Sequence, residues 1–235
     1  MAALTPMMAQ YMEVKNQYKD CILFYRLGDF YEMFFDDALT ASRELEITLT
    51  GRDCGQEERA PMCGVPYHAC DIYLNKLIEK GYKVAICEQM EDPKLAKGIV
   101  KREVIRIVTP GTNMSKAILD ETRNNYLMCI FGCNDEYGVA VCDITTGEFR
   151  SCHISSTSKL YDEINKYSPT EIIGNGKFLS CDLNFDYMKE KMKITISEAP
   201  SHYFNDDTCE DFIKRQFKVG TIDGLGIDEQ NDMLL

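Results

Sequence analysis

Residues 28–37 read Gly-Asp-Phe-Tyr-Glu-Met-Phe-Phe-Asp-Asp, and they follow an apolar run, Ile22-Leu23-Phe24-Tyr25, that is typical of a strand. Arg26, Leu27 and the first residue of the decamer, Gly28, break the apolar run, and Phe30 and Glu32 follow two positions apart near a predicted turn. A phenylalanine that only packs in a core needs neither an acidic neighbour nor a glycine hinge. This decamer is therefore our first candidate both for an element boundary and for a functional site.

Around the decamer, the first half of the chain predicts helices alternating with strands. We expect helices over residues 6–18, 31–45 and 69–80, and strands over residues 21–25, 46–50, 82–87 and 100–108. Residues 60–67 are expected to be irregular, because Pro61, Gly64 and Pro66 exclude a helix. Helices that alternate with strands and end in two successive strands predict an α/β (α+β) domain, with a mixed β-sheet covered by helices.

A second domain is predicted after Thr109-Pro110-Gly111-Thr112, so that residues 1–112 form one domain, 113–125 a linker and 126–235 the other. The second domain begins with three strands joined by tight turns, at residues 126–133, 137–144 and 148–154. Helices over 156–167, 186–191 and 206–217 and strands over 171–174 and 193–197 follow. Three antiparallel strands followed by αβ units predict a ribonuclease-H-like arrangement. The apolar ending at Leu235 leads us to expect that this domain is truncated and that the chain is a piece of a longer protein.

Charge is distributed unevenly along the 235 residues. The net charge of −12 by itself argues against a nucleic-acid partner. Residues 1–112 carry 14 Lys and Arg against 17 Asp and Glu, whereas residues 113–235 carry 12 against 21. One short window of the first part is basic, with Lys94, Lys97, Lys101, Arg102 and Arg106 against Glu103. Such a strip is compatible with phosphate contact, and it is also what a solvated loop and strand look like.

Targeting and redox signals are scarce. The chain has no apolar run of about 18 residues, so we expect no membrane span. Residues 1–10 do not resemble a secretory signal, and a cytoplasmic location is expected. Eleven cysteines without a signal are then interpreted as reduced and mostly buried thiols.

Phe30 and Glu32 have two interpretations. They can be a core aromatic and a helix-start acid near the helix dipole, which is the more common combination at this spacing. Alternatively, Phe30 is pushed between base pairs of DNA, which kinks the duplex, and Glu32 tests the exposed base with a hydrogen bond. Insertion requires less free energy where a pair is already mismatched, so such a wedge detects deformability.

Other constellations offer weaker chemistry. Asp143 on a predicted strand raises a ribonuclease-H-like two-metal nuclease as an alternative, although the preceding strand, 126–131, holds no carboxylate to complete a metal cluster. Cys54, Cys63, His68 and Cys70 lack the spacing of a metal site. A phosphate-binding G-x-x-x-x-G-K-[ST] motif does not occur in the sequence. A third alternative is a protein-interaction module that uses the acidic second domain.

Several segments recur in the order and at the spacing of a known family. They are Thr5-Pro6-Met7-Met8, Phe24–Glu32, Pro61–Ala69, Ala85–Gln89, Asp92-Pro93 and Arg106–Thr112. On these residues the first half resembles the mismatch-binding domain of the bacterial MutS family of DNA mismatch-repair proteins. The second half resembles the family's connector domain, with Asp143–Phe149 as its nearest motif.

The resemblance implies a function and a site. Phe30 would be the wedge stacked on a mispaired or unpaired base of double-stranded DNA, Glu32 the hydrogen-bonding partner of that base, and Arg52 and Arg102 the DNA-backbone contacts. The family's ATPase, with its ATP and Mg²⁺, and most of its homodimer contacts lie outside this stretch. The chain alone is therefore expected to be a non-enzymatic monomer without a cofactor or metal of its own. The connector domain would contact the repair partner MutL.

Overall fold

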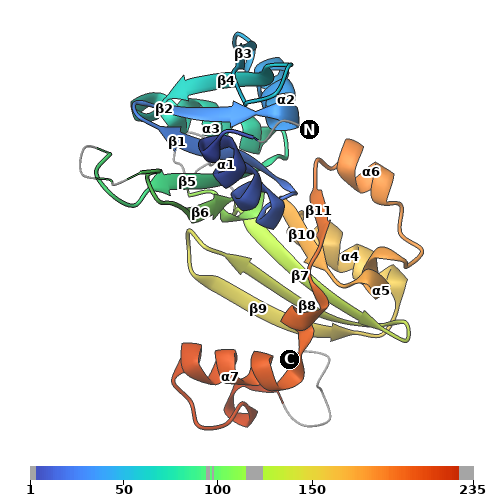
Figure 1. The fold of residues 1–235 in the computed structure, drawn as a ribbon. Coiled ribbons are helices and arrows are strands. Elements are labelled where there is room, and N and C mark those ends of the chain that lie inside the picture. Colours follow the sequence, from blue (N-terminus) through green and yellow to red (C-terminus); the bar gives the residue numbers. More distant parts are fainter. Residues whose placement is uncertain (1–3, 94–95, 97, 115–123, 228–235) are drawn as a thin grey trace. The chain divides into compact units, whose positions relative to one another are not determined.

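The computed structural model describes residues 4–93, 96, 98–114 and 124–227 (Figure 1). Contacts divide the chain into two compact units, Met1–Ile118 and Leu119–Leu235, and each contains one mixed sheet with helices, as the sequence predicts. Of the predicted linker 113–125, residues 115–123 lie outside the described residues, so its extent stays a prediction.

The first unit is built on a six-stranded sheet in the order β3-β4-β2-β1-β5-β6. Its strands are β1 (Cys21–Leu27), β2 (Phe30–Phe34), β3 (Thr50–Arg52), β4 (Ala60–Pro66), β5 (Lys83–Gln89) and β6 (Arg102–Val108). β1 pairs in parallel with β5, and the other neighbouring strands pair antiparallel. β1 therefore lies at the centre, between β2 and β5, which explains why its sequence is apolar at consecutive positions.

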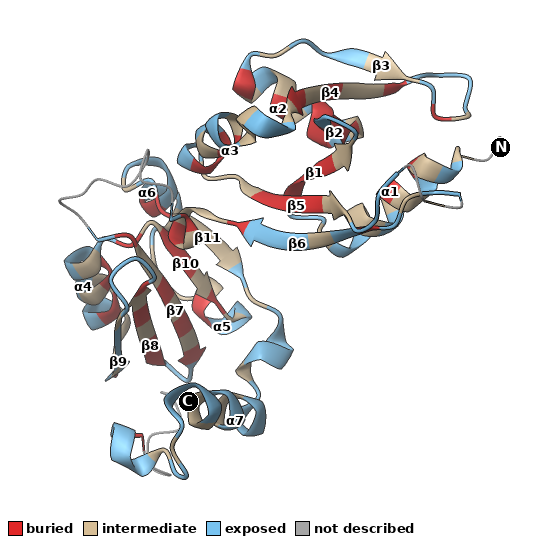
Figure 2. Cartoon of the chain, turned by 90° about the vertical axis from the view of Figure 1, so that its left-hand side faces the viewer, coloured by how far each residue is buried: buried red, intermediate tan, exposed pale blue. Residues whose placement is uncertain are grey.

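Alternate residues of β1 enter two different cores. Ile22 and Phe24 pack under α2 (Phe35–Leu45) and α3 (Cys70–Glu79), whereas Leu23 and Tyr25 pack under α1 (Pro6–Gln17). Figure 2 shows the resulting band of buried strands, with α2 and α3 over one face of the sheet and α1 over the other. Short 3₁₀ turns at Tyr67–Ala69 and Pro110–Thr112 complete the unit.

Three predictions for this unit are wrong. The helix expected from residue 31 begins only at Phe35, because Phe30–Phe34 form a strand between β1 and β4. The segment expected to be irregular is the strand Ala60–Pro66, with its prolines near the two ends of the strand, where ladder donors are needed least. The strand expected at 46–50 is shifted to Thr50–Arg52, since Glu46 ends α2 in the left-handed region, with φ of 56°.

The second unit has a five-stranded sheet in the order β11-β10-β7-β8-β9. Its strands are β7 (Tyr126–Cys133), β8 (Glu136–Asp143), β9 (Glu148–Ile154), β10 (Glu171–Gly174) and β11 (Thr195–Glu198). β7, β8 and β9 form an antiparallel meander, and β10 and β11 continue the sheet in parallel from β7. This is the ribonuclease-H-like order that the sequence predicts. The first hairpin turns at Asn134 and Asp135, both with positive φ, which suits a two-residue loop.

Helices cover this sheet unequally. The helices of the unit are α4 (Thr157–Tyr167), α5 (Gly176–Leu179), α6 (Phe185–Glu190) and α7 (Asp206–Phe217), with 3₁₀ turns at Ser201–Phe204 and Asp223–Leu225. One continuous core joins the sheet to α4, α5 and α6, including Met128, Ile164 and Phe178. α7 has no buried residue among its twelve and touches the meander through the ring contact between Phe149 and Phe217.

All eleven cysteines lie in the described part of the chain, and each is a free thiol, as predicted. Burial is less uniform than expected, because Cys21, Cys54, Cys63 and Cys87 are buried whereas Cys133 is exposed and the others are intermediate. Among the described residues, no helix is long and apolar enough to cross a membrane.

Candidate functional site

Phe30 lies at the tip of the hairpin formed by β1 and β2. Leu27 pairs with Phe30, so Gly28 and Asp29 alone form the turn, and Gly28 adopts the left-handed conformation with φ of 58°. The Phe30 side chain is 47% exposed, in contrast to Tyr31 and Met33 beside it, which are buried. The structure therefore displays this phenylalanine at the surface, on a short turn, outside the apolar core.

Glu32 follows on the same face of β2, because side chains two positions apart in a strand point to one side. Phe34, the next residue on that face, is buried under α1, so the row runs from an exposed ring through a carboxylate to the core. Gly64 of β4 lies opposite Glu32, and a Cβ atom there would lie 3.4 Å from Glu32 Cγ. Glycine at this position leaves room beside the Glu32 side chain.

Arg52 joins this row from β3, across β4. Its guanidinium donates a hydrogen bond to Oε2 of Glu32, and its Cζ lies 6.0 Å from the centre of the Phe34 ring. The Arg52 side chain remains 37% exposed, whereas that of Glu32 is 15% exposed. The fold thus brings together Phe30, Glu32 and Arg52, three of the four predicted site residues, on one face of the sheet.

Arg102 is placed differently. It is buried, and its guanidinium donates to the carbonyl oxygen of Arg26 at 2.7 Å and to Gln10 Oε1 at 3.0 Å. Its Cζ also lies 5.0 Å from the centre of the Tyr25 ring. Since this cation already bonds acceptors on β1 and α1, its geometry gives no support to the predicted phosphate contact. Of the predicted basic strip, Lys94 and Lys97 lie outside the described residues, and Lys101 pairs with Glu103 at 2.5 Å.

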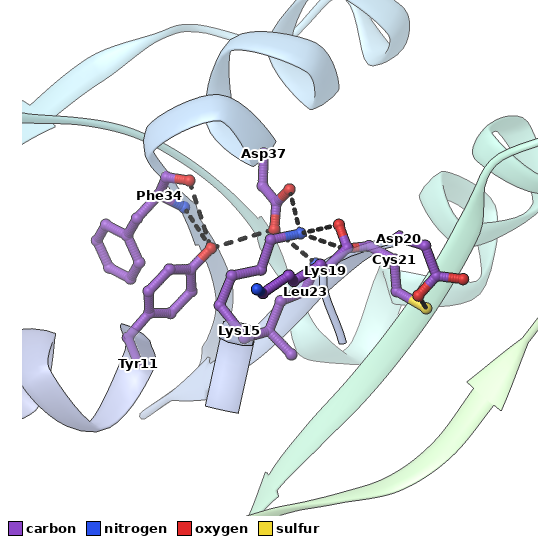
Figure 3. A network of polar contacts seen from close by, with 8 residues as sticks. All are labelled: Tyr11, Lys15, Lys19, Asp20, Cys21, Leu23, Phe34 and Asp37. Atoms are coloured by element: carbon purple, nitrogen blue, oxygen red, sulfur yellow. Dashed lines mark hydrogen bonds and ion pairs between the residues drawn. The ribbon is translucent and has the colours of Figure 1, made fainter. Parts of the chain in front are cut away.

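A buried polar network fixes the inner end of β2 (Figure 3). Asp37, at the start of α2, accepts hydrogen bonds from the Tyr11 hydroxyl at 3.2 Å, from Lys15 Nζ at 2.9 Å and from the Leu23 amide at 3.0 Å. The Tyr11 hydroxyl oxygen also accepts a hydrogen bond from the Phe34 amide at 3.4 Å and lies 3.3 Å from the Phe34 carbonyl oxygen. Burial, together with the negative charge of Asp37, raises the pKa of Tyr11 far above its ordinary value. The network joins α1, β1 and α2 at Phe34, the buried end of the row that carries Phe30 and Glu32.

Sequence reasoning gave no role to several residues that shape this site. Gly64 beside Glu32 and Asp37 behind Phe34 are examples. In the sequence, Gly64 is one of three residues that exclude a helix, and Asp37 is only the last residue of the opening decamer. A glycine within a strand often marks close approach of another group, and that signal pointed to Gly64.

The geometry of the described residues gives little support to a nuclease site at Asp143 or to a metal site. Asp143 is buried and accepts hydrogen bonds from the Thr145 amide and hydroxyl at 2.8 and 2.6 Å and from the Asn125 amide at 3.2 Å. Burial alone would raise the pKa of Asp143, but these hydrogen bonds outweigh it and lower the pKa. In the described part of the chain, no group of three His, Cys, Asp or Glu side chains could hold a metal ion. Through its hydrogen bonds from Thr145, Asp143 therefore stabilises the turn between β8 and β9.

Comparison with known protein families assigns both halves of the chain. Residues 5–117 match the model of MutS domain I, and residues 125–235 match that of MutS domain II. The chain belongs to the MutS family. The two matched regions correspond to the two units of the fold, which we call domain I and domain II from here on.

Curated relatives agree with this assignment. The chain is 60% identical over 229 residues to the DNA mismatch repair protein MutS of Lachnoclostridium phytofermentans, covering 97% of this chain and 25% of the relative. It is 58% identical over 231 residues to that of Acetivibrio thermocellus, covering 97% of this chain and 27% of the relative. The chain thus spans about a quarter of the length of these curated relatives, within which it corresponds to domains I and II.

Proposed function

We propose that domain I recognises mispaired or unpaired bases in double-stranded DNA, with Phe30 as an inserted wedge and Glu32 as the hydrogen-bonding partner of the base. The observation that carries the proposal is the placement of Phe30, which is 47% exposed at the tip of a two-residue turn. An exposed ring on a short turn, two positions from a carboxylate, suits a side chain that enters a stack of bases. The curated relatives are named as DNA mismatch repair proteins, which agrees with this role.

The energetics of insertion favour a defective duplex. An aromatic ring pushed between base pairs from the minor groove partly unstacks them and kinks the DNA. Unstacking costs a few kcal/mol and less at a mismatch, whereas stacking of a base on an aromatic side chain returns about 1–3 kcal/mol. The net free energy of insertion depends on whether the base pair is correctly paired. Phe30 therefore detects deformability of the duplex and need not read the sequence.

The negative charge of Glu32 repels phosphates and therefore cannot serve general affinity for DNA. We assign Glu32 instead to the discrimination of mismatched from matched base pairs. In the protein alone it accepts a hydrogen bond from Arg52, whose side chain is 37% exposed and can reach a phosphate. In the proposed complex Arg52 meets the DNA backbone, and the Glu32 carboxylate accepts a hydrogen bond from the N–H of a displaced base.

For the whole protein, the proposal includes partners beyond DNA. We place the MutL contact on domain II, because the net charge of −9 over residues 113–235, from 12 basic against 21 acidic side chains, suits a protein partner better than DNA. ATP, Mg²⁺ and the homodimer contacts belong to the family's regions outside domains I and II, and the cytoplasm is the proposed location. Retention of MutL by domain II after deletion of residues 1–112 would support the docking part, and its loss would refute it.

The wedge is tested in a chimera, defined as this chain joined to the remaining three quarters of the Lachnoclostridium phytofermentans relative. Affinities for matched and G·T-mismatched duplexes are measured at one fixed salt concentration. Phe30→Ala is expected to lower the ratio of mismatched to matched affinity by about 5- to 150-fold, the value of one stacked base. Salt-dependent binding to matched DNA should persist.

The matched control is Phe212→Ala, which removes an equally large exposed ring from α7 of domain II. It should leave the affinity ratio unchanged. Equal loss of matched and mismatched binding in Phe30→Ala would refute the wedge role. The 235-residue chain alone is expected to bind both duplexes weakly, because one wedge and a few cations cannot replace a dimer that encircles DNA, and the same titration measures this.

A further inference from the structure

The turn that displays Phe30 is held from the opposite face of the sheet by side chains that the proposed function does not use. Arg26 pairs with Tyr31 between β1 and β2, and both lie on the face covered by α2 and α3. Phe30 and Glu32 point to the other face. The side chains that hold the turn are those of Arg26, Tyr67 and Glu88.

Arg26 contacts the turn directly and indirectly. Its Nε donates to the carbonyl oxygen of Gly28 at 2.5 Å, and its Cζ lies 3.7 Å from the centre of the Tyr67 ring. The Tyr67 amide in turn donates to the carbonyl oxygen of Asp29 at 2.9 Å. Both residues of the turn are thus held, Gly28 by Arg26 itself and Asp29 by the residue on which Arg26 stacks.

The remaining side of the guanidinium faces a carboxylate. Arg26 Nη1 lies 3.5 Å from Glu88 Oε1 on β5, the atom that also accepts a hydrogen bond from the Tyr31 hydroxyl. The Arg26 side chain is only 16% exposed. Two of its nitrogens and its flat face therefore make contacts within the protein, a combination that lysine cannot reproduce.

We infer that Arg26 is a positioning residue, which holds the Gly28–Asp29 turn so that Phe30 is directed outward before DNA arrives. This inference rests on the proposed function of Phe30. A segment that is ordered in advance loses less conformational entropy on binding, and that gain applies only to contacts made by the segment. Positioning therefore strengthens the mismatch contact, which uses Phe30, and leaves background binding to the DNA backbone unchanged.

The first test measures motion of the turn in the 235-residue chain. Backbone order parameters for the amides of Gly28, Asp29 and Phe30 are compared among wild type, Arg26→Ala and Arg26→Lys. We expect values that fall from about 0.85 toward 0.6 at these amides in both variants, with order elsewhere in domain I unchanged. The matched control is Arg43→Ala, because Arg43 is 70% exposed and pairs only with the neighbouring Glu44 among the described ion pairs. Unchanged order at the turn in both Arg26 variants would overturn the inference.

The second test measures affinity in the chimera. Arg26→Ala and Arg26→Lys should lower the ratio of mismatched to matched affinity by about three- to tenfold. Arg43→Ala should not change it. In the Phe30→Ala background the Arg26 substitutions should have no further effect on the ratio, because the positioned side chain is already gone. If Arg26→Ala fails to fold, Arg26→Lys, which keeps the charge, carries the test.

The outcomes separate the two proposals. If Phe30→Ala leaves the affinity ratio unchanged, the proposed function fails. If Phe30→Ala lowers the ratio and both Arg26 variants leave it unchanged, the positioning role alone fails. Equal weakening of matched and mismatched binding by the Arg26 variants, with a reduced salt dependence, would identify a direct phosphate contact and would also overturn the positioning role.

Discussion

Arg52 on β3 donates a hydrogen bond to the Glu32 carboxylate on β2, across the intervening strand β4. The two residues have opposite effects on a DNA backbone, since one charge attracts phosphates and the other repels them. Each is partly exposed, with Arg52 more open to solvent than Glu32. Substitutions at the two positions should therefore separate affinity for DNA from discrimination of mismatches.

Removing the charge of Glu32 should strengthen background binding and weaken discrimination. In the chimera, Glu32→Gln is expected to raise affinity for matched DNA by about fivefold, equivalent to about 1 kcal/mol of lost repulsion. The ratio of mismatched to matched affinity should fall. Glu79→Gln, on the exposed surface of α3, is the control for loss of one negative charge. An unchanged affinity ratio in Glu32→Gln would contradict the role of Glu32 as a discriminator, and unchanged affinity for matched DNA would contradict the repulsion.

Removing Arg52 should weaken binding to every duplex alike. If Arg52 neutralises one phosphate, Arg52→Ala lowers the slope of log affinity against log salt by about 1, for matched and mismatched DNA equally. Titrations at several salt concentrations measure this slope. A change in the affinity ratio with an unaltered slope would instead show that Arg52 acts only through Glu32.

Stability of domain I should depend on the buried network around Asp37. Asp37→Ala leaves Lys15 Nζ, the Tyr11 hydroxyl and the Leu23 amide without this acceptor. We expect a loss of about 3 kcal/mol in the free energy of unfolding, typical of a buried ion pair that loses one partner. Urea unfolding of the 235-residue chain measures the change. Asp36→Ala, at the adjacent exposed position, should alter stability little, and equal losses in the two variants would refute the network's importance.

The turn at Gly28 should resist substitution for a conformational reason alone. Gly28 has φ of 58°, and a Cβ atom there would meet nothing within 4 Å. Gly28→Ala is therefore expected to cost about 1–2 kcal/mol of stability through backbone strain, with no steric clash. Gly220→Ala is a matched control, because its surroundings are equally open and its φ is not in the left-handed region. Thermal unfolding compares them, and equal stabilities would contradict the assigned strain.

Alkaline pH should destabilise domain I through its buried thiols. Burial, reinforced by the charge of Asp37 for Cys63, raises the pKa of Cys63 and of Cys87 to about 12 from an ordinary 9.0. Between these values the unfolded chain has lost protons that the folded chain keeps. The stability contribution is thus fully present below about pH 9 and decreases as the pH rises toward 12.

The measurement is the free energy of unfolding between about pH 8 and 11, under reducing conditions. Cys87→Ala should flatten the decline relative to wild type, whereas Cys133→Ala, at an exposed thiol, should leave the slope unchanged. Parallel declines in wild type and Cys87→Ala would show that Cys87 does not contribute.

Strand β2 shows where sequence periodicity reaches its limit. The apolar residues of 30–35 fit a helical stripe and a strand buried on both faces equally well. Pairing with β1 and β4 decides for the strand, and the change to helix occurs at Phe35, whose φ of 53° is unusual for a bulky residue. Such a conformation is imposed by tertiary packing, so local preferences could not reveal it.

The candidate site was predictable only in part, because the rest of it also depends on how distant strands pair. The resemblance to the family, and not the spacing alone, singled out Phe30 and Glu32, and the fold places both on one face of β2. The pairing of Glu32 with Arg52 depends on β4 lying between their strands, a segment whose prolines had excluded it from the predicted sheet. The burial of Arg102 depends on β6 lying beside β5, where its guanidinium reaches acceptors on two other elements. In domain II short strands alternate with polar turns within a short stretch of sequence. This local pattern predicted the antiparallel meander of β7, β8 and β9.

The parallel pairing of β1 with β5, from Cys21 with Lys83 to Tyr25 with Cys87, has a consequence for biosynthesis. A nascent chain emerging from the ribosome contains α1 and the β1–β2 hairpin well before β5 has been translated. During that interval the apolar residues of β1 lack the neighbouring strand that later shields one of their edges, and such exposed edges promote aggregation. Chaperone binding to nascent chains is therefore expected to be strongest before residue 89 leaves the exit tunnel and to decline afterwards.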